Sequence, residues 1–274
     1  MKKKVAKIII SILVIAMTAT ILGGCGEERT KLKEEYKTET ERIQKEEEML
    51  AEKLDECQAL IDAGEKPYEE EKLSAFVEAV AAAPGKVIEI PKRPFKTEDI
   101  KALVNDTLKK TSYLGTIEEL NTLKGELERS IRIMKQITNP PEEFVINCVM
   151  QADTVVGYEA ATEDHDPNGN LHKPGGYTSA VFFQTSTSRI NPLISSSIVE
   201  QGTDAGGQIE VYETEEAAKQ REQYLAGFDG TILASGSHRV LGTMVIRTSH
   251  WLNATQQKEL EDQLVTIFTT LPEE

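Results

Sequence analysis

The chain has 274 residues, of which 28% are charged and 39% hydrophobic, and its formal net charge at pH 7 is −15. This length leaves room for two modest domains. The negative charge excludes nucleic acid as an expected partner, because phosphates would be repelled. With three cysteines in the whole chain, the composition also excludes a disulfide-rich scaffold.

The N-terminal segment carries the pattern of an export signal. Four lysines precede an apolar run, 8–22, which is shorter than the roughly 20 residues that a membrane-spanning helix needs. The run ends in Leu22-Gly23-Gly24-Cys25, which resembles the lipobox of bacterial lipoproteins, in which the cysteine is diacylated and becomes the first mature residue. Two acyl chains anchor a protein stably in a membrane, whereas a single chain binds the membrane only marginally. We therefore expect a signal peptide over 1–24 and acylation of Cys25, with palmitate as one acyl group.

Cleavage before Cys25 changes the charge balance. It removes four lysines and leaves 27 Lys+Arg against 46 Asp+Glu, a net charge of −19. Such a charge opposes adsorption to anionic lipid headgroups. We therefore expect the protein to contact the membrane through its lipid anchor and not through a basic surface, and to lie on the extracellular face of the cell membrane.

The segment 27–56 carries twelve acids and seven bases and contains no Gly or Pro. Its apolar residues are sparse before Leu50 and follow helical spacing after it. We expect residues 25–48 to form a charged helical stalk in solvent. A dimeric coiled coil would need apolar residues at both seam positions, and Glu39 and Glu46 occupy one of them. The sequence therefore favours a monomer.

Residues 49–163 have the pattern of an antiparallel helix bundle, because amphipathic segments alternate with short breaks rich in Gly and Pro. Cys57 and Cys148 both lie in helical apolar patterns, which favours two buried free thiols over one long-range disulfide. Thr116 and Glu119 have the spacing of a capping box. The expected helices end at or before the breaks and cover about 50–63, 68–83, 97–110, 116–138 and 142–156.

Several stretches of the chain resemble known Gram-positive proteins. Three of them are similar to the three-helix FIVAR-type modules that are repeated in very large matrix-binding proteins of the Ebh type: Ala59–Gly64, Pro67-Tyr68 and Thr97–Leu103. Others resemble a group of short lipoproteins labelled EbhA, whose function is unassigned: Met134–Pro140, Glu163-Asp164 and Asp166–Leu171. The resemblance implies a three-helix module in the helical half, and a matrix-binding role in the proteins that repeat it many times; this chain carries one module.

From residue 164 the pattern changes to strands. β-branched and aromatic residues mark 177–184 and 208–212, and two or three further strands fall within 231–248. One interleaved helix is capped by Thr214 and the last by Asn253 with Gln256. We expect an α+β domain over 164–274, with an antiparallel sheet and both helices on one face. Trp251 is expected to cap the core where the last strand meets the last helix. The fold class is then α+β with two domains, the stalk and bundle preceding the sheet.

One loop offers candidate cation ligands. Asp164, Asp166, Asn168 and Asn170 fall at positions 1, 3, 5 and 7 of an EF-hand-like count, and Gly169 is at position 6. Position 12 is glycine, so the bidentate acid is missing, and Asp-Pro-Asn-Gly also favours a plain turn. We expect a structural turn with no cofactor, and at most weak Ca²⁺ binding.

Catalytic signatures are lacking in the sequence. The serines of the run 195–197 lie in neither a nucleophile elbow nor a Ser-x-x-Lys context, and the run reads as a polar loop. Arg239, Arg247 and His250 gather on the strand segments and could line one anion-receiving face, although edge charges that discourage strand pairing explain them equally well.

These patterns favour a lipid-anchored, non-enzymatic protein that presents a binding surface to an unknown envelope or extracellular protein. The first alternative is an envelope enzyme, or an accessory to one, that uses a cation site at 164–170. The second is a structural or immunity-type lipoprotein. Convergence of the Asp164 loop with His238 or His250 in one pocket would favour the enzyme, and their dispersal would favour binding.

Overall fold

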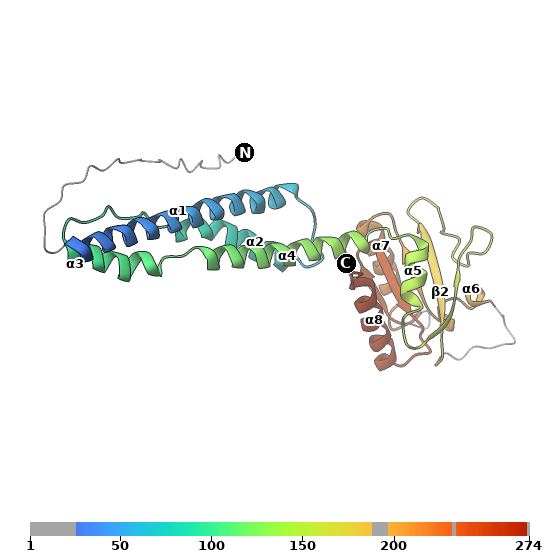
Figure 1. Cartoon of the computed structure of the whole chain (residues 1–274). Coiled ribbons are helices and arrows are strands. Elements are labelled where there is room, and N and C mark those ends of the chain that lie inside the picture. Colours follow the sequence, from blue (N-terminus) through green and yellow to red (C-terminus); the bar gives the residue numbers. More distant parts are fainter. Residues whose placement is uncertain (1–25, 188–196, 232–233, 273–274) are drawn as a thin grey trace. The chain divides into compact units, whose positions relative to one another are not determined.

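The computed structural model describes residues 26–187, 197–231 and 234–272 (Figure 1). The expected signal peptide and Cys25 lie outside these residues. The described chain divides into two compact units: unit 1 combines 26–51 with 86–115, and unit 2 combines 52–85 with 116–272. Within these ranges no helix is both long and apolar enough to cross a bilayer. The expected α+β fold class is confirmed, since helices precede a five-stranded antiparallel sheet.

The helices of the N-terminal half form where the sequence predicts them. The long α4 begins at Leu114, ahead of the expected cap at Thr116, and ends before Asn139-Pro140-Pro141. Cys57 and Cys148 are buried free thiols, as expected. The bounds are α1 Gly26–Ala63, α2 Glu70–Ala82, η1 Ala83–Lys86, α3 Thr97–Ala102, η2 Leu103–Thr107, η3 Leu108–Lys110, α4 Leu114–Gln136 and α5 Glu142–Val149.

The segment predicted to be a solvated stalk is helical, but it packs along residues 86–115 in unit 1. Leu32 and Ile43 are buried, although the sequence around them is sparse in apolar residues. The Tyr36 hydroxyl donates to the carbonyl of Pro91 at 2.9 Å, which fixes the returning chain against α1. The expectation of a free stalk was wrong because the partner that buries these side chains lies more than fifty residues further along the chain.

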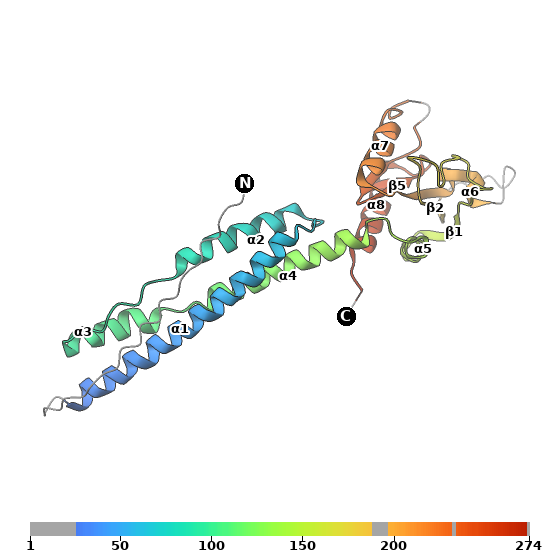
Figure 2. The ribbon, with the colours of Figure 1, turned by 90° about the horizontal axis from the view of Figure 1, so that it is seen from above.

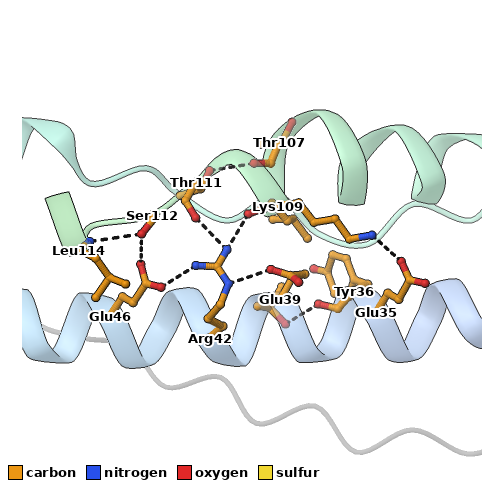
Figure 3. A network of polar contacts seen from close by, with 12 residues as sticks. Glu35, Tyr36, Glu39, Arg42, Glu46, Thr107, Lys109, Thr111, Ser112 and Leu114 are labelled. Carbon is orange, nitrogen blue, oxygen red and sulfur yellow. Dashed lines mark hydrogen bonds and ion pairs between the residues drawn. The ribbon is translucent and has the colours of Figure 1, made fainter.

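A polar network holds α1 to the end of η3 in unit 1 (Figure 3). Arg42 Nη2 donates to the carbonyls of Leu108 and Thr111, at 2.9 and 2.8 Å. Glu46 is 6% exposed and accepts from Arg42 Nη1, from the Ser112 hydroxyl and from the backbone N–H of Tyr113. Burial alone would raise the pKa of Glu46, but these donors lower it below its usual value.

We predict that Glu46→Ala destabilises unit 1 by about 2–3 kcal/mol, because a buried backbone N–H, a hydroxyl and a guanidinium all lose their acceptor. The lowered pKa means that the contribution is present above about pH 4.3 and is lost as pH falls through the folded-state pKa. Amide hydrogen exchange at 108–113 measures the effect. Glu48→Ala, at an exposed position of the same helix, should leave exchange unchanged. Equal protection in both variants would contradict the prediction.

The sheet has the order β1-β2-β3-β5-β4, and all neighbouring strands are antiparallel. The sequence predicted one helix from Glu142 to Val156, and this prediction was wrong at its end. Helix α5 stops at Val149, and Val155 already pairs with Thr185 in the first strand of the sheet. The apolar spacing fits a helix, but the two β-branched residues at 155 and 156 open a strand. The strands are β1 Val155–Ala160, β2 Ser179–Thr185, β3 Gly206–Val211, β4 His238–Leu241 and β5 Met244–Thr248.

Helices cover both faces of the sheet. α5 and α8 (Ala254–Thr269) pack on the face that carries Phe183 and Ile246, whereas α7 (Glu215–Ala226) packs on the face that carries Phe182 and Val245. The expectation that α7 and α8 share one face was wrong. Strands β2, β3 and β5 are buried along almost their whole length, so each face needs a cover. Two short helices, α6 Ile198–Gln201 and η4 Gly202–Ala205, precede β3.

The core on the α8 side includes residues that precede the expected domain boundary at 164. Val145, Val149 and Val155 are buried together with Phe183 and Phe268. The expected caps of the later helices are present: Thr214 accepts from the N–H of Ala217, and Asn253 forms a capping box with Gln256. α5 and β1 therefore contribute to the same core as residues 164–272.

Candidate functional site

One apolar depression of unit 2 is a groove of about 770 Å³ between the end of α4, α5 and the end of α8. Its apolar lining comes from Phe144 on α5, from Ile267 and Leu271 at the end of α8, and from Pro140-Pro141 in the turn. Arg132, Lys135 and Gln151 add polar atoms at the same site. We call this site the α4–α5–α8 groove.

Local sequence positions the walls of the groove. Asn139 adopts a positive φ of 43° and its N–H donates to the Thr243 hydroxyl at 2.6 Å, so α4 ends and the chain turns directly into α5. Gln136 Nε2 donates to the carbonyls of Phe268 and Thr270, at 2.7 and 3.0 Å, and thereby holds the end of α8 beside α4. These bonds keep two helices that are far apart in sequence at a fixed separation.

Cys148 lines this groove and is 5% exposed. Burial raises the pKa of its thiol to about 11, so the thiol stays protonated at neutral pH. Because the thiolate is the nucleophile, Cys148 is suited to packing and not to covalent chemistry.

The Asp164 loop forms a turn organised by one carboxylate. Asp166 accepts hydrogen bonds from the backbone N–H groups of Asn168, Asn170 and Leu171 at 3.1, 2.7 and 2.9 Å, and also from the Tyr177 hydroxyl. Burial would raise the pKa of Asp166, but these donors lower it. Among the described residues, no cluster of three or more His, Cys, Asp or Glu side chains is arranged to hold a metal ion.

We predict that millimolar Ca²⁺ leaves the melting temperature unchanged, because a cation would have to displace the donors that already surround both oxygens of Asp166. A site occupied at tenfold its dissociation constant would instead stabilise the fold by roughly 1.4 kcal/mol. Differential scanning fluorimetry with Ca²⁺ or with chelator measures this. A Ca²⁺-dependent rise that disappears in the Asp164→Ala/Asp166→Ala variant would establish the cation site instead.

The candidate anion-binding residues are not brought together by described contacts. Arg239 pairs with Asp262 of α8 at 3.2 Å, and it lies opposite Ile246, on the α8 face of the sheet. Arg247 is buried on the α7 face. His250 lies 3.2 Å from Asp204 and stacks against Trp251, with ring centroids 4.5 Å apart. Each charge thus has a local partner.

Trp251 and His238 also differ from the sequence expectations. Trp251 is 51% exposed and does not cap the core; the buried residue at that junction is Leu252. The ring of His238 lies between two acids, with Nε2 3.3 Å from Asp229 and Nδ1 3.2 Å from Glu222, the latter without hydrogen-bond geometry. Among the described residues, no contact joins His238 or His250 to the Asp164 loop.

A buried charge cluster on the α7 face was missed by the sequence analysis. Glu210 is fully buried and accepts from Arg221 Nε and Nη2, each at 2.9 Å, from Arg247 Nη1 at 2.8 Å and from the Tyr212 hydroxyl at 2.8 Å. Arg247 Nη1 also donates to Gln208 at 3.0 Å. Gln208 and Glu210 alternate with Ile209 and Val211, a pattern typical of a half-exposed strand, yet both polar side chains are buried. Arg221 on the following helix supplies the charge that permits the burial of Glu210.

The cluster has a structural role. It ties β3, β5 and α7 through one carboxylate. Burial would raise the pKa of Glu210, but the two arginines lower this pKa below its usual value.

Comparisons of the chain with models of protein families, with curated proteins and with solved structures found no match.

Proposed function

We propose that this protein is a lipid-anchored, non-enzymatic envelope protein that holds a partner protein at the outer surface of the cell membrane. The α4–α5–α8 groove would receive an apolar segment of that partner. Anchoring rests on the lipobox-like Leu22-Gly23-Gly24-Cys25 that follows an export signal.

The observation that carries the binding role is the lining of this groove. Phe144, Ile267 and Leu271 are only partly buried, and they share one concave surface of about 770 Å³. Helix-in-groove and extended-peptide recognition both use such apolar depressions with a few polar groups at the rim. The hydrogen bonds from Gln136 pre-form the surface, which lowers the entropic cost of binding.

A second line of support is the use of the ionisable side chains. Asp166 organises a turn, Glu210 pairs with two arginines and the Cys148 thiol stays protonated. In the described part of the chain, these groups are therefore occupied by structural contacts. This arrangement supports binding over the enzyme alternative, which would need them free to reach a substrate.

The test is photo-crosslinking in intact cells. A photoreactive residue at Gln151 or Thr270, both exposed at the groove, should crosslink the same envelope protein. The matched control is Tyr224, which is 59% exposed on α7 at the other face of the sheet and should not capture that protein. The crosslink should disappear when Leu271→Glu places a charge in the apolar lining. Equal capture from all three positions would contradict the proposal.

A further inference from the structure

An exposed aromatic residue stands out in unit 1. Phe95 is 90% exposed, the most exposed large hydrophobic side chain of the described chain. It lies in Pro91-Lys92-Arg93-Pro94-Phe95-Lys96, a stretch with three bases and no acid in a chain of strongly negative charge. Lys92 and Lys96 are exposed as well. The combination of an exposed aromatic ring with flanking lysines is typical of sites that contact the interfacial region of a bilayer.

Two hydrogen bonds place Phe95 at the N-terminal end of α1. The Tyr36 hydroxyl donates to the carbonyl of Pro91, and Arg29 Nη2 donates to the carbonyl of Phe95, both at 2.9 Å. From residue 36 back to residue 29 the helix advances by about 10 Å. The chain from 91 to 95 spans a similar distance when nearly extended, at most ~13 Å. It therefore runs antiparallel to α1, toward the beginning of the helix.

Helix α3 supports the same placement. Figures 1 and 2 both show α3 beside the first turns of α1, and Lys101 of α3 lies 3.5 Å from Glu28. Arg29 is four residues from Cys25 in the sequence. Phe95 is thus attached to the part of the fold that is closest in sequence to the predicted acylation site.

We propose that Arg29, Lys92, Phe95 and Lys96, here called the Phe95 surface, dock onto the anionic face of the membrane that holds the lipid anchor. This proposal rests on the proposed acylation of Cys25. The Phe95 ring enters the interfacial region, and the three bases lie among the headgroups. Unit 1 then has a second contact with the bilayer besides the acyl chains, which orients it relative to the membrane.

The net charge of the chain does not oppose this docking. Charges separated by more than a Debye length, about 8 Å at physiological ionic strength, are largely screened. Near the Phe95 surface, the first turns of α1 and α3 carry four acids, and the three bases of the surface together with Lys101, which pairs with Glu28, equal them in number. The anchor also makes the contact intramolecular, so that even a weak attraction is sufficient.

The test measures how deeply two positions of unit 1 enter a bilayer. The acylated full chain, extracted from membranes, is reconstituted into phosphatidylcholine vesicles that contain brominated lipids, with or without phosphatidylglycerol. Trp251→Phe removes the natural tryptophan in every sample. Phe95→Trp reports on the Phe95 surface. Leu114→Trp is the matched control, since Leu114 is 50% exposed in the same unit. It directly follows Ser112 and Tyr113, which donate hydrogen bonds to Glu46, and Glu46 lies about 25 Å along α1 from Arg29.

The tryptophan at position 95 should be quenched several-fold more than the one at 114, and more in vesicles with phosphatidylglycerol than without it. Lys92→Glu/Lys96→Glu should lower that quenching toward the level of the control. Equal quenching at the two positions would overturn the proposal, and capture of position 95 by a protein in cells would then assign the surface to a partner. The intact mass of the same sample separates the two hypotheses: a chain without acyl groups overturns the anchor and the docking together, whereas an acylated chain with position 95 unquenched overturns the docking alone.

Discussion

Replacing Glu210 by alanine should destabilise the sheet of unit 2 by about 3–5 kcal/mol, because two guanidiniums would be left in a buried site without their shared carboxylate. Domains of this size have only about 5–15 kcal/mol of total stability, so the variant should unfold at much lower denaturant concentration or fail to accumulate. Urea denaturation followed by circular dichroism measures the difference in unfolding free energy.

The matched control for this variant is Glu213→Ala, three residues further along, where the side chain is exposed. It should change the unfolding free energy by no more than about 0.5 kcal/mol. Burial raises the pKa of Glu210, but Arg221 and Arg247 lower it further than burial raises it. Its stabilising contribution is therefore fully present above about pH 4.3 and is lost as pH falls through the folded-state pKa. If the urea midpoints of Glu210→Ala and Glu213→Ala agree within error, the cluster makes no net contribution to the unfolding free energy, which would contradict the prediction.

Removing the Cys25 thiol should abolish the association of the protein with the membrane fraction completely. Cys25→Ser leaves no sulfur atom to acylate, so the variant should incorporate no labelled palmitate and should move from the membrane fraction to the medium or to an uncleaved precursor. Metabolic labelling and cell fractionation measure both properties. Cys57→Ser is the matched control, because Cys57 is buried within α1 and should not affect labelling. Unchanged palmitate incorporation in Cys25→Ser would contradict the prediction.

Local signals in the sequence were sufficient for much of the fold. The stop at Asn139-Pro140-Pro141 and the cap at Asn253 with Gln256 depend on residues within a few positions of one another, and both appear where predicted. The strand at Val155 was misread because Cys148, Ala152 and Val155 have the i, i+4, i+7 spacing of one helical face and are also buried in the core beside the sheet. Periodicity does not separate a short buried strand from the end of a helix.

Long-range contacts account for the other differences. Glu46 looked like a residue that opposes burial, yet it is buried because Ser112 and the N–H of Tyr113, more than sixty residues away, supply its hydrogen bonds. Glu210 is buried for the same reason, since its hydrogen-bond donor Arg247 lies on β5, 37 residues further along the chain. The groove was not predictable either, because its walls come from segments about 120 residues apart whose apolar residues each fit an ordinary helix stripe.

The charge of the whole chain was also an incomplete guide to the membrane contact that we propose. The total of −19 expected after cleavage gives no information on where the bases lie. The hydrogen bonds to Pro91 and Phe95 place the segment that carries Lys92 and Lys96 beside α1. Local arrangement of charge, and not its sum, decides such contacts within a Debye length.

The intact mass of the protein extracted from cell membranes tests the central claim of lipid anchoring most directly. The account predicts a chain that begins at Cys25 and carries a diacylglyceryl group on its sulfur, with the first 24 residues absent. A chain that still begins at Met1, or one that begins at Cys25 but carries no acyl groups, would contradict it.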